Sequence, residues 1–204
     1  MPAQFRSLQL ANHLHLFNTQ SPQRTYGKMS TMKALVMKGE RQASVVSDRP
    51  LPQLRSSYII VKPVAVALNP TDWKHIANLN RPGLLCGCDY AGIVEKTGTG
   101  YTKNWKVGDR ISGVAHGGNS KQPEDGAFAE HIVVKADVQW RLPDHMSFEE
   151  GSTLGVGVVT CGQGLFQTLK LDLPTDGAQK KVEYVLIYGG STATGALGIQ
   201  FLKL

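Results

Sequence analysis

The chain has 204 residues, of which 41% are hydrophobic and 19% charged, as expected for a globular protein of one or two domains. Five basic residues precede Glu40 with no acidic residue among them, so the rest of the chain carries little of the +6 net charge. The sequence shows neither a basic stripe interleaved with aromatics nor an apolar run near the roughly 20 residues of a membrane helix, so we expect no nucleic-acid or membrane partner. Three unevenly spaced cysteines favour a reducing, cytoplasmic location.

Residues 1–31 differ in composition from the rest. They lack acidic residues and are rich in Ser, Thr, Gln and Asn. A basic, acid-poor segment is typical of a mitochondrial transit peptide, and we keep that targeting signal as an alternative. Because Arg6 is the only basic residue within the apolar part, we predict an unstructured leader, or residues upstream of a start at Met29 or Met32.

Short strand patterns separated by glycine and proline run from residue 32 to residue 154. We expect strands over 32–37, 43–46, 58–62, 64–68, 87–95, 107–111 and 126–134. A turn at 69–72 precedes a short helix through Ile76, and Gly117–Asp125 is polar and glycine-rich, as in a surface loop. This spacing indicates a barrel-like β domain.

Helical signals follow the β domain. Ser147, with acids at positions 149 and 150, predicts a capped helix start. Residues 155–169 then form an apolar helical pattern that contains several glycines.

The last stretch of the chain predicts a nucleotide-binding unit. Val185–Tyr188 has the pattern of a buried strand, two glycines follow as a tight turn, and 196–202 reads as a helix. A strand, a glycine turn and a helix N-terminus favour phosphate binding. The strict G-x-G-x-x-G spacing is missing, and the hydroxyls of Ser191, Thr192 and Thr194 could donate to phosphate instead. The alternative is that these residues only cap the helix.

Several motifs occur in a known family order: M-K-A-L-V at 32–36, N-P-T-D-W-K at 69–74, G-C-D-Y-A-G-I-V at 87–94, V-G-D-R-I-S-G at 107–113 and G-A-F-A-E-H at 126–131. Residues 32–204 thereby resemble the medium-chain dehydrogenase/reductase family. Within it, Y-G-G-S-T-A-T at 188–194 most resembles the zinc-independent, trans-acting enoyl reductases of fungal polyketide synthesis.

The resemblance implies a mixed α+β and α/β fold. A GroES-like β-barrel catalytic domain (32–154) would be followed by a Rossmann domain, of which 155–204 is the incomplete beginning. It implies NADPH-dependent reduction of the α,β-double bond of an acyl chain carried on a partner polyketide synthase. We expect a monomer. The choice of NADP over NAD comes from the resemblance alone.

The resemblance also implies the site residues. Cofactor contacts are expected from Thr71, Asp72, Trp73, Lys74, Ser191, Thr192, Ala193 and Thr194. Lys74 is the charged donor expected to act in catalysis, with a solvated helix lysine as the alternative, and Asp72 could equally be a helix cap. The acyl pocket is expected along Gly155, Val156, Gly157, Val158, Val159, Thr160, Cys161 and Gly162, where small residues could also serve close helix packing.

We expect no metal site. A catalytic zinc needs three protein ligands, and zinc-dependent relatives have Cys where this chain has Asn69-Pro70, His near Cys88, and Cys near Val156. Of these positions only Cys88 could ligate a metal. Cys161 lacks an activating histidine in any motif, so we do not expect a nucleophile there.

Two other hypotheses fit the same residues. One is a quinone or enone reductase acting on free small molecules, and the other is a non-catalytic remnant whose barrel domain is an interaction module. Because a sheet of one or two strands is not stable alone, we expect a C-terminally truncated chain that is inactive unless another chain completes the fold.

Overall fold

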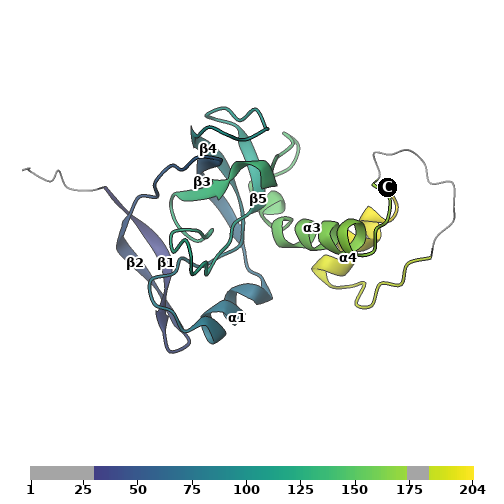
Figure 1. Cartoon of the computed structure of the whole chain (residues 1–204), viewed down its shortest axis with the longest axis horizontal. Helices are drawn as coiled ribbons and strands as arrows, with labels where there is room; N and C mark the ends of the chain where they lie inside the picture. The colour runs from purple at the N-terminus through teal and green to yellow at the C-terminus, as the bar shows by residue number, and fades with distance from the viewer. Residues whose placement is uncertain (1–29, 174–183) are drawn as a thin grey trace, which may run out of the picture.

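The computed structural model describes residues 30–173 and 184–204. Its larger lobe is built from β-strands and its smaller lobe from two packed helices, with α3 leading from one to the other (Figure 1). The strands are β1 (Thr31–Gly39), β2 (Gln42–Pro50), β3 (Tyr58–Ala67), β4 (Asp89–Thr97), β5 (Arg110–Val114), β6 (Ile132–Lys135) and β7 (Gln139–Arg141). The helices are α1 (Pro70–Leu79), α2 (Phe148–Ser152), α3 (Gly155–Cys161) and α4 (Ala193–Phe201).

Two antiparallel sheets form the larger lobe. β1 and β2 pair as a hairpin, and the other five strands follow the order β6-β3-β4-β5-β7. The expected break at Pro63 is a register shift within one continuous strand, β3, because proline lacks the N–H that the ladder needs. The predicted hairpin, the helix after 69–72 and the loop over 117–125 are all confirmed.

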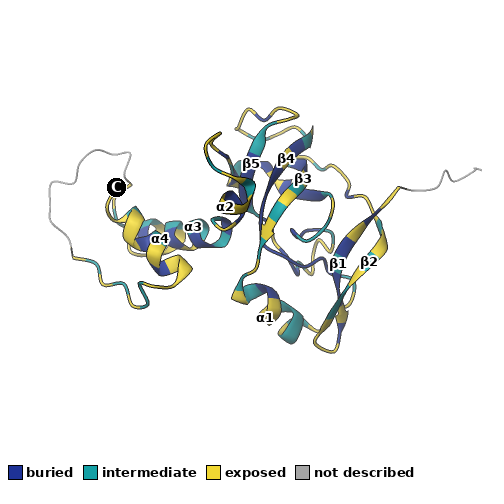
Figure 2. Cartoon of the chain, turned by 180° about the vertical axis from the view of Figure 1, so that it is seen from behind, coloured by how far each residue is buried: buried dark blue, intermediate teal, exposed yellow. Residues whose placement is uncertain are grey.

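The core of this lobe lies between the curled sheet and the loops that cover it. Ile59, Val61, Val94, Ile111 and Ile132 belong to one buried cluster (dark blue in Figure 2). Residues 59–61 of β3 and 89–92 of β4 are buried without interruption, so both faces of the sheet are covered there, and exposed positions occur only further along each strand. The barrel-like domain predicted from the sequence is therefore confirmed.

The segment 126–131 was predicted as part of a strand, but β6 begins only at Ile132. The amides of Ala127 and Phe128 donate instead to the carbonyls of Gly87 and Cys86, at 2.9 and 3.0 Å. The segment also contacts β1: the Leu35 amide donates to the Phe128 carbonyl at 2.8 Å, and Ala34 and Ala129 form an isolated bridge. It is therefore joined to a loop on one side and to β1 on the other without forming a regular strand of its own.

Most of the predicted leader lies outside the described residues. Its last residue, Thr31, already belongs to β1, and the Ser30 carbonyl accepts a hydrogen bond from the Leu51 amide at 3.3 Å. The predicted start of the ordered domain at residue 32 is therefore slightly late. In the described part of the chain no helix has both the length and the apolar character needed to cross a bilayer.

The strand predicted over Val185–Tyr188 is wrong, because the structure has no strand there. Exposure still alternates along the segment: Leu186 and Tyr188 are 93% and 100% exposed, whereas Ile187 faces Gly198 of α4. The segment is thus extended and has one face against the helix. It is not a strand because no described strand lies beside it to bond its backbone.

Candidate functional site

The first group of predicted site residues lies at the start of α1. Asn69 is the N-cap, Pro70 opens the helix, and the Asp72 Oδ2 accepts a hydrogen bond from the Asn69 amide at 2.7 Å. Asp72 is only 7% exposed, and its Oδ1 is buried without a hydrogen-bond partner in the described part of the chain. The structure gives its carboxylate the capping role that the sequence left open, and its contact with a cofactor stays a prediction.

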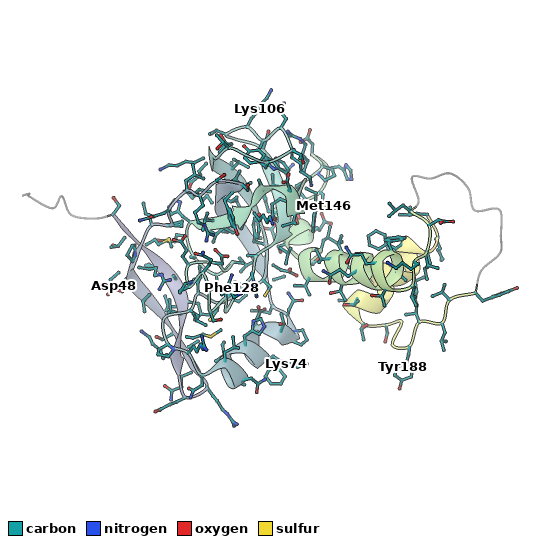
Figure 3. All side chains as sticks on the ribbon, viewed as in Figure 1. Asp48, Lys74, Lys106, Phe128, Met146 and Tyr188 are labelled. Carbon is teal, nitrogen blue, oxygen red and sulfur yellow. The ribbon has the colours of Figure 1, made fainter. Side chains whose placement is uncertain are left out.

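The next residues of α1 face outward. Trp73 is 61% exposed, and the Lys74 Nζ lies 5.8 Å from the centroid of its ring (Figure 3). Lys74 forms no salt bridge with any described residue, so none of residues 30–173 and 184–204 neutralises its charge. Thr71 Oγ1 contacts His75 Nε2 at 3.2 Å. A free ammonium at this place suits a donor to a substrate oxygen, and it equally suits a solvated lysine.

The glycines of α3 allow two close approaches. A Cβ on Gly155 would lie 2.3 Å from Asp89 Oδ1 and 2.5 Å from the Gly113 carbonyl oxygen, and one on Gly157 would lie 2.5 Å from Leu197 Cδ1 of α4. Small residues here therefore serve packing. A Cβ on Gly162, by contrast, would meet nothing within 4 Å. The predicted acyl pocket along 155–162 stays a prediction, with its middle already packed against α4.

Beyond Cys161 the helix widens into a π-helical segment, Gly162–Thr168, where the sequence predicts a continuous helix. Such segments lose the i→i−4 bonding pattern and are uncommon outside functional or strained places.

The glycine turn and α4 form the second group. Thr192 is the N-cap: its Oγ1 accepts from the Gly195 amide at 3.1 Å and donates to the Gly189 carbonyl at 2.8 Å. Its only hydroxyl proton is thereby used within the turn, so Thr192 cannot also donate to a phosphate. Ser191 and Thr194 are exposed and keep that capacity. The first amides of α4 also lack intrahelical partners, and they give this end a partial positive charge.

One contact joins the predicted pocket helix to the predicted phosphate turn. The Cys161 thiol donates to the Thr194 carbonyl at 3.3 Å across the α3–α4 interface. Burial raises the pKa of this thiol, so it stays protonated and is poorly suited to act as a nucleophile. Residues 155–162 and 191–194, which the sequence assigned to one site, therefore lie side by side.

Asp89 connects the start of α1 with the start of α3, and the sequence did not single it out as a site residue. Its Oδ2 accepts from the Asn69 Nδ2 at 2.8 Å, and its Oδ1 accepts from the Val156 amide at 2.6 Å. Burial raises the pKa of this carboxyl to about 6, against the lowering effect of these two hydrogen bonds. A signal did exist: Asp89 is the only charged residue between Arg81 and Glu95, in a strand predicted to be buried.

The same network bears on the metal prediction. In the described ranges no group of three His, Cys, Asp or Glu side chains is placed to hold a metal ion. Burial, with the charge of Asp72 adding to it, raises the pKa of Cys88 to about 12 and that of Cys86 to about 11. Both thiols are therefore protonated at neutral pH, and the expectation of no metal site stays a prediction.

Comparison with known proteins gives the site a context. Residues 55–144 match the model of the alcohol dehydrogenase GroES-like domain. The trans-enoyl reductase resD of Aspergillus sclerotiorum is 56% identical over 183 residues, which cover 85% of this chain and 51% of that protein. The trans-enoyl reductase TOXD of Cochliobolus carbonum is 56% identical over 86% of this chain and 59% of that protein. The trans-enoyl reductase ACTTS2 of Alternaria alternata is 45% identical over 86% of this chain and 51% of that protein. The chain spans about half the length of the curated relatives it matches.

Two solved structures share the fold. The quinone oxidoreductase of Coxiella burnetii is 26% identical with a TM-score of 0.64, over 85% of this chain and 54% of that one. A mycobacterial structure complexed with NADPH is 22% identical with a TM-score of 0.54, over 70% of this chain and 42% of that one. These matches confirm the GroES-like architecture followed by part of a Rossmann region.

Proposed function

Because the chain belongs to the medium-chain dehydrogenase/reductase family and resembles its fungal trans-enoyl reductases, we propose that it serves the NADPH-dependent reduction of an enoyl chain. The substrate is the α,β-double bond of a polyketide acyl group carried on a partner synthase. The observation that carries the proposal is the 56% identity to resD, which extends over 85% of the chain.

The α4 turn fits a dinucleotide cofactor. The amides at the start of the helix and the exposed hydroxyls of Ser191 and Thr194 are hydrogen-bond donors, which suits a pyrophosphate. The NADPH complex of the mycobacterial fold neighbour supports the choice of a nicotinamide cofactor. When bound, that cofactor would supply the hydride for the β-carbon of the substrate, and a proton from solvent would reach the α-carbon to complete the saturated chain.

The chain's own residues then have three tasks. The Lys74 ammonium donates a hydrogen bond to the thioester oxygen, where negative charge grows during reduction. The cofactor side of α1 is shaped by Thr71, Asp72 and Trp73. The wall beside the acyl chain is formed by residues 155–162. We propose that no zinc takes part, since the residues at the three ligand positions of zinc-dependent relatives are Asn69, Cys88 and Val156 and offer at most one ligand.

Cofactor binding is tested by titrating the chain with NADPH and following the nicotinamide fluorescence. We expect saturable binding that weakens about fivefold in Ser191→Ala and in Thr194→Ala, because each loses one hydrogen bond to phosphate. The matched control is Ser47→Ala, which removes an exposed hydroxyl on β2 and leaves the affinity unchanged. Absence of saturation would rule out the proposed cofactor site and favour a non-catalytic interaction module.

The reaction is tested by NADPH oxidation with an enoyl thioester and, separately, with a quinone. With the fold completed, as the sequence predicts is needed for activity, we expect turnover of the thioester. The kcat should fall about 100-fold in Lys74→Ala, which removes a donor to the developing charge. Lys62→Ala, at an exposed lysine of β3, should leave kcat unchanged. Turnover of the quinone alone would overturn the enoyl assignment and establish a reductase of free small molecules.

A further inference from the structure

Asp89 lies where the sheet meets both helix starts of the predicted site. It is the first residue of β4, the central strand of the sheet, and it pairs with Ala67 on one side and with Val114 on the other. It is 1% exposed. A carboxylate so deeply buried is costly unless each oxygen has a donor, and both oxygens here have one.

The two donors come from the two predicted walls of the site. Asn69 caps α1, which carries Lys74, and Val156 belongs to the first turn of α3, which carries the predicted acyl pocket. The three residues are far apart in the sequence, and no described hydrogen bond joins Asn69 to Val156 directly. One rigid carboxylate thus sets the positions of both helix starts relative to the sheet and to each other.

The close approach of Gly155 to Asp89 restricts how α3 can pack against the sheet. Gly155 passes so close that its Cβ would lie 2.3 Å from Asp89 Oδ1, so α3 can reach this carboxylate only with glycine there. Gly155 and Asp89 therefore act together: the missing side chain admits the helix, and the carboxylate then binds its Val156 amide.

We infer that Asp89 is a positioning residue, which holds Lys74 and the 155–162 wall at the separation that the enoyl substrate requires. This inference rests on the proposed function for its purpose, but the bridge itself can be tested without any turnover. Asp89 acts through Asn69 and Val156, with no contact of its own to substrate assumed.

The decisive experiment removes the acceptor oxygens at position 89 and then restores hydrogen bonding without the charge. Asp89→Leu has a side chain of similar length but offers no acceptor to Asn69 or to the Val156 amide. Asp89→Asn can keep both bonds: its oxygen accepts from the Val156 amide, and its NH₂ group donates to the side-chain oxygen of Asn69 once that carboxamide turns over. Exposed Asp48, on β2, provides the control Asp48→Asn.

The first readout is hydrogen exchange at the Val156 amide, resolved by NMR. We expect exchange to speed up about tenfold or more in Asp89→Leu, to stay close to the original rate in Asp89→Asn, and to be unchanged in Asp48→Asn. The second readout is kcat with the enoyl thioester, which should fall about tenfold in Asp89→Leu and recover in Asp89→Asn, with KM for NADPH nearly constant.

The outcomes decide as follows. Loss of both readouts in Asp89→Leu with recovery in Asp89→Asn supports the inference. An exchange rate at Val156 that does not change in Asp89→Leu, or an Asn variant no better than the Leu variant, overturns the bridge. If Asp89→Leu does not fold, Asn69→Ala takes its place: it removes only the α1 bond and should lower kcat while leaving Val156 protected. A fully active Asn69→Ala overturns the inference, whereas lack of NADPH binding in the unaltered chain refutes the proposed function and leaves the bridge standing.

Discussion

The β lobe and the α3–α4 lobe are stabilised in different ways. The β lobe has a closed core, in which branched side chains such as Ile59 and Ile111 are fully buried. The helical lobe instead relies on close contacts of small residues, and it leaves Leu186 and Tyr188 on its surface. Residues 55–144 of the β lobe match a recognised domain model, and the helical lobe lies outside the matched residues. The β lobe is thus closed over its own core, whereas the helical lobe leaves large apolar side chains exposed, Tyr188 among them (Figures 2 and 3).

The largest expected effect tests this contrast directly. Ile111→Ala removes a side chain that is 0% exposed and should lower the free energy of unfolding by about 4 kcal/mol, through lost burial and the cavity left behind. Leu186→Ala shortens a side chain that is 93% exposed and should change it by less than about 0.5 kcal/mol. Urea denaturation followed by tryptophan fluorescence measures both. A comparable loss in both variants would mean that Leu186 is covered in solution.

The next effect concerns the junction between the lobes. Gly155→Ala places a Cβ against Asp89 and the Gly113 carbonyl, so α3 must move away, and we expect a loss of about 3 kcal/mol. Gly162→Ala is the matched control on the same helical segment, because that Cβ meets nothing within 4 Å and the backbone is right-handed helical. It should stabilise the chain by about 0.5 kcal/mol. Thermal denaturation followed by circular dichroism gives the Tm of each variant. Equal changes in Tm would contradict the tight packing of Gly155 against Asp89.

The smallest expected effect is the pH dependence of the Asp89 bridge. Because burial raises the folded-state pKa of Asp89 to about 6, the native chain keeps a proton that the unfolded chain releases near its ordinary pKa. Asp89 therefore favours folding at low pH, and this contribution is lost as the pH rises through the folded pKa. From roughly pH 4.5 to pH 7 the loss is about 2 kcal/mol.

The measurement compares the unaltered chain with Asp89→Asn by urea denaturation across that pH range. Because the other titrating groups contribute to both proteins, they cancel in the difference of their unfolding free energies. As the pH rises, the unfolding free energy of the unaltered chain should therefore fall relative to that of Asp89→Asn. A difference that is flat, or that shifts the other way, would show that burial does not raise the pKa of Asp89 in solution.

Local patterns in the sequence were enough for much of this protein. Short strand patterns separated by glycine and proline predicted the hairpin and most of the sheet, because strand-forming residues and turn residues can be recognised locally. The caps at Ser147 and Thr192 were predictable for a similar reason, because a cap and its partners lie within three residues of one another. The family motifs added the order of the domains, which the comparisons then confirmed.

Long-range pairing decided the rest. Val185–Tyr188 has every local mark of a strand, yet a strand exists only where a neighbour bonds its backbone, and that neighbour is not a property of the segment. Asp89 likewise shows only a solitary charge in an apolar run. Its partners, Asn69 and Val156, are brought to it by the sheet and by the close approach at Gly155, so its role could be seen only once the chain was folded.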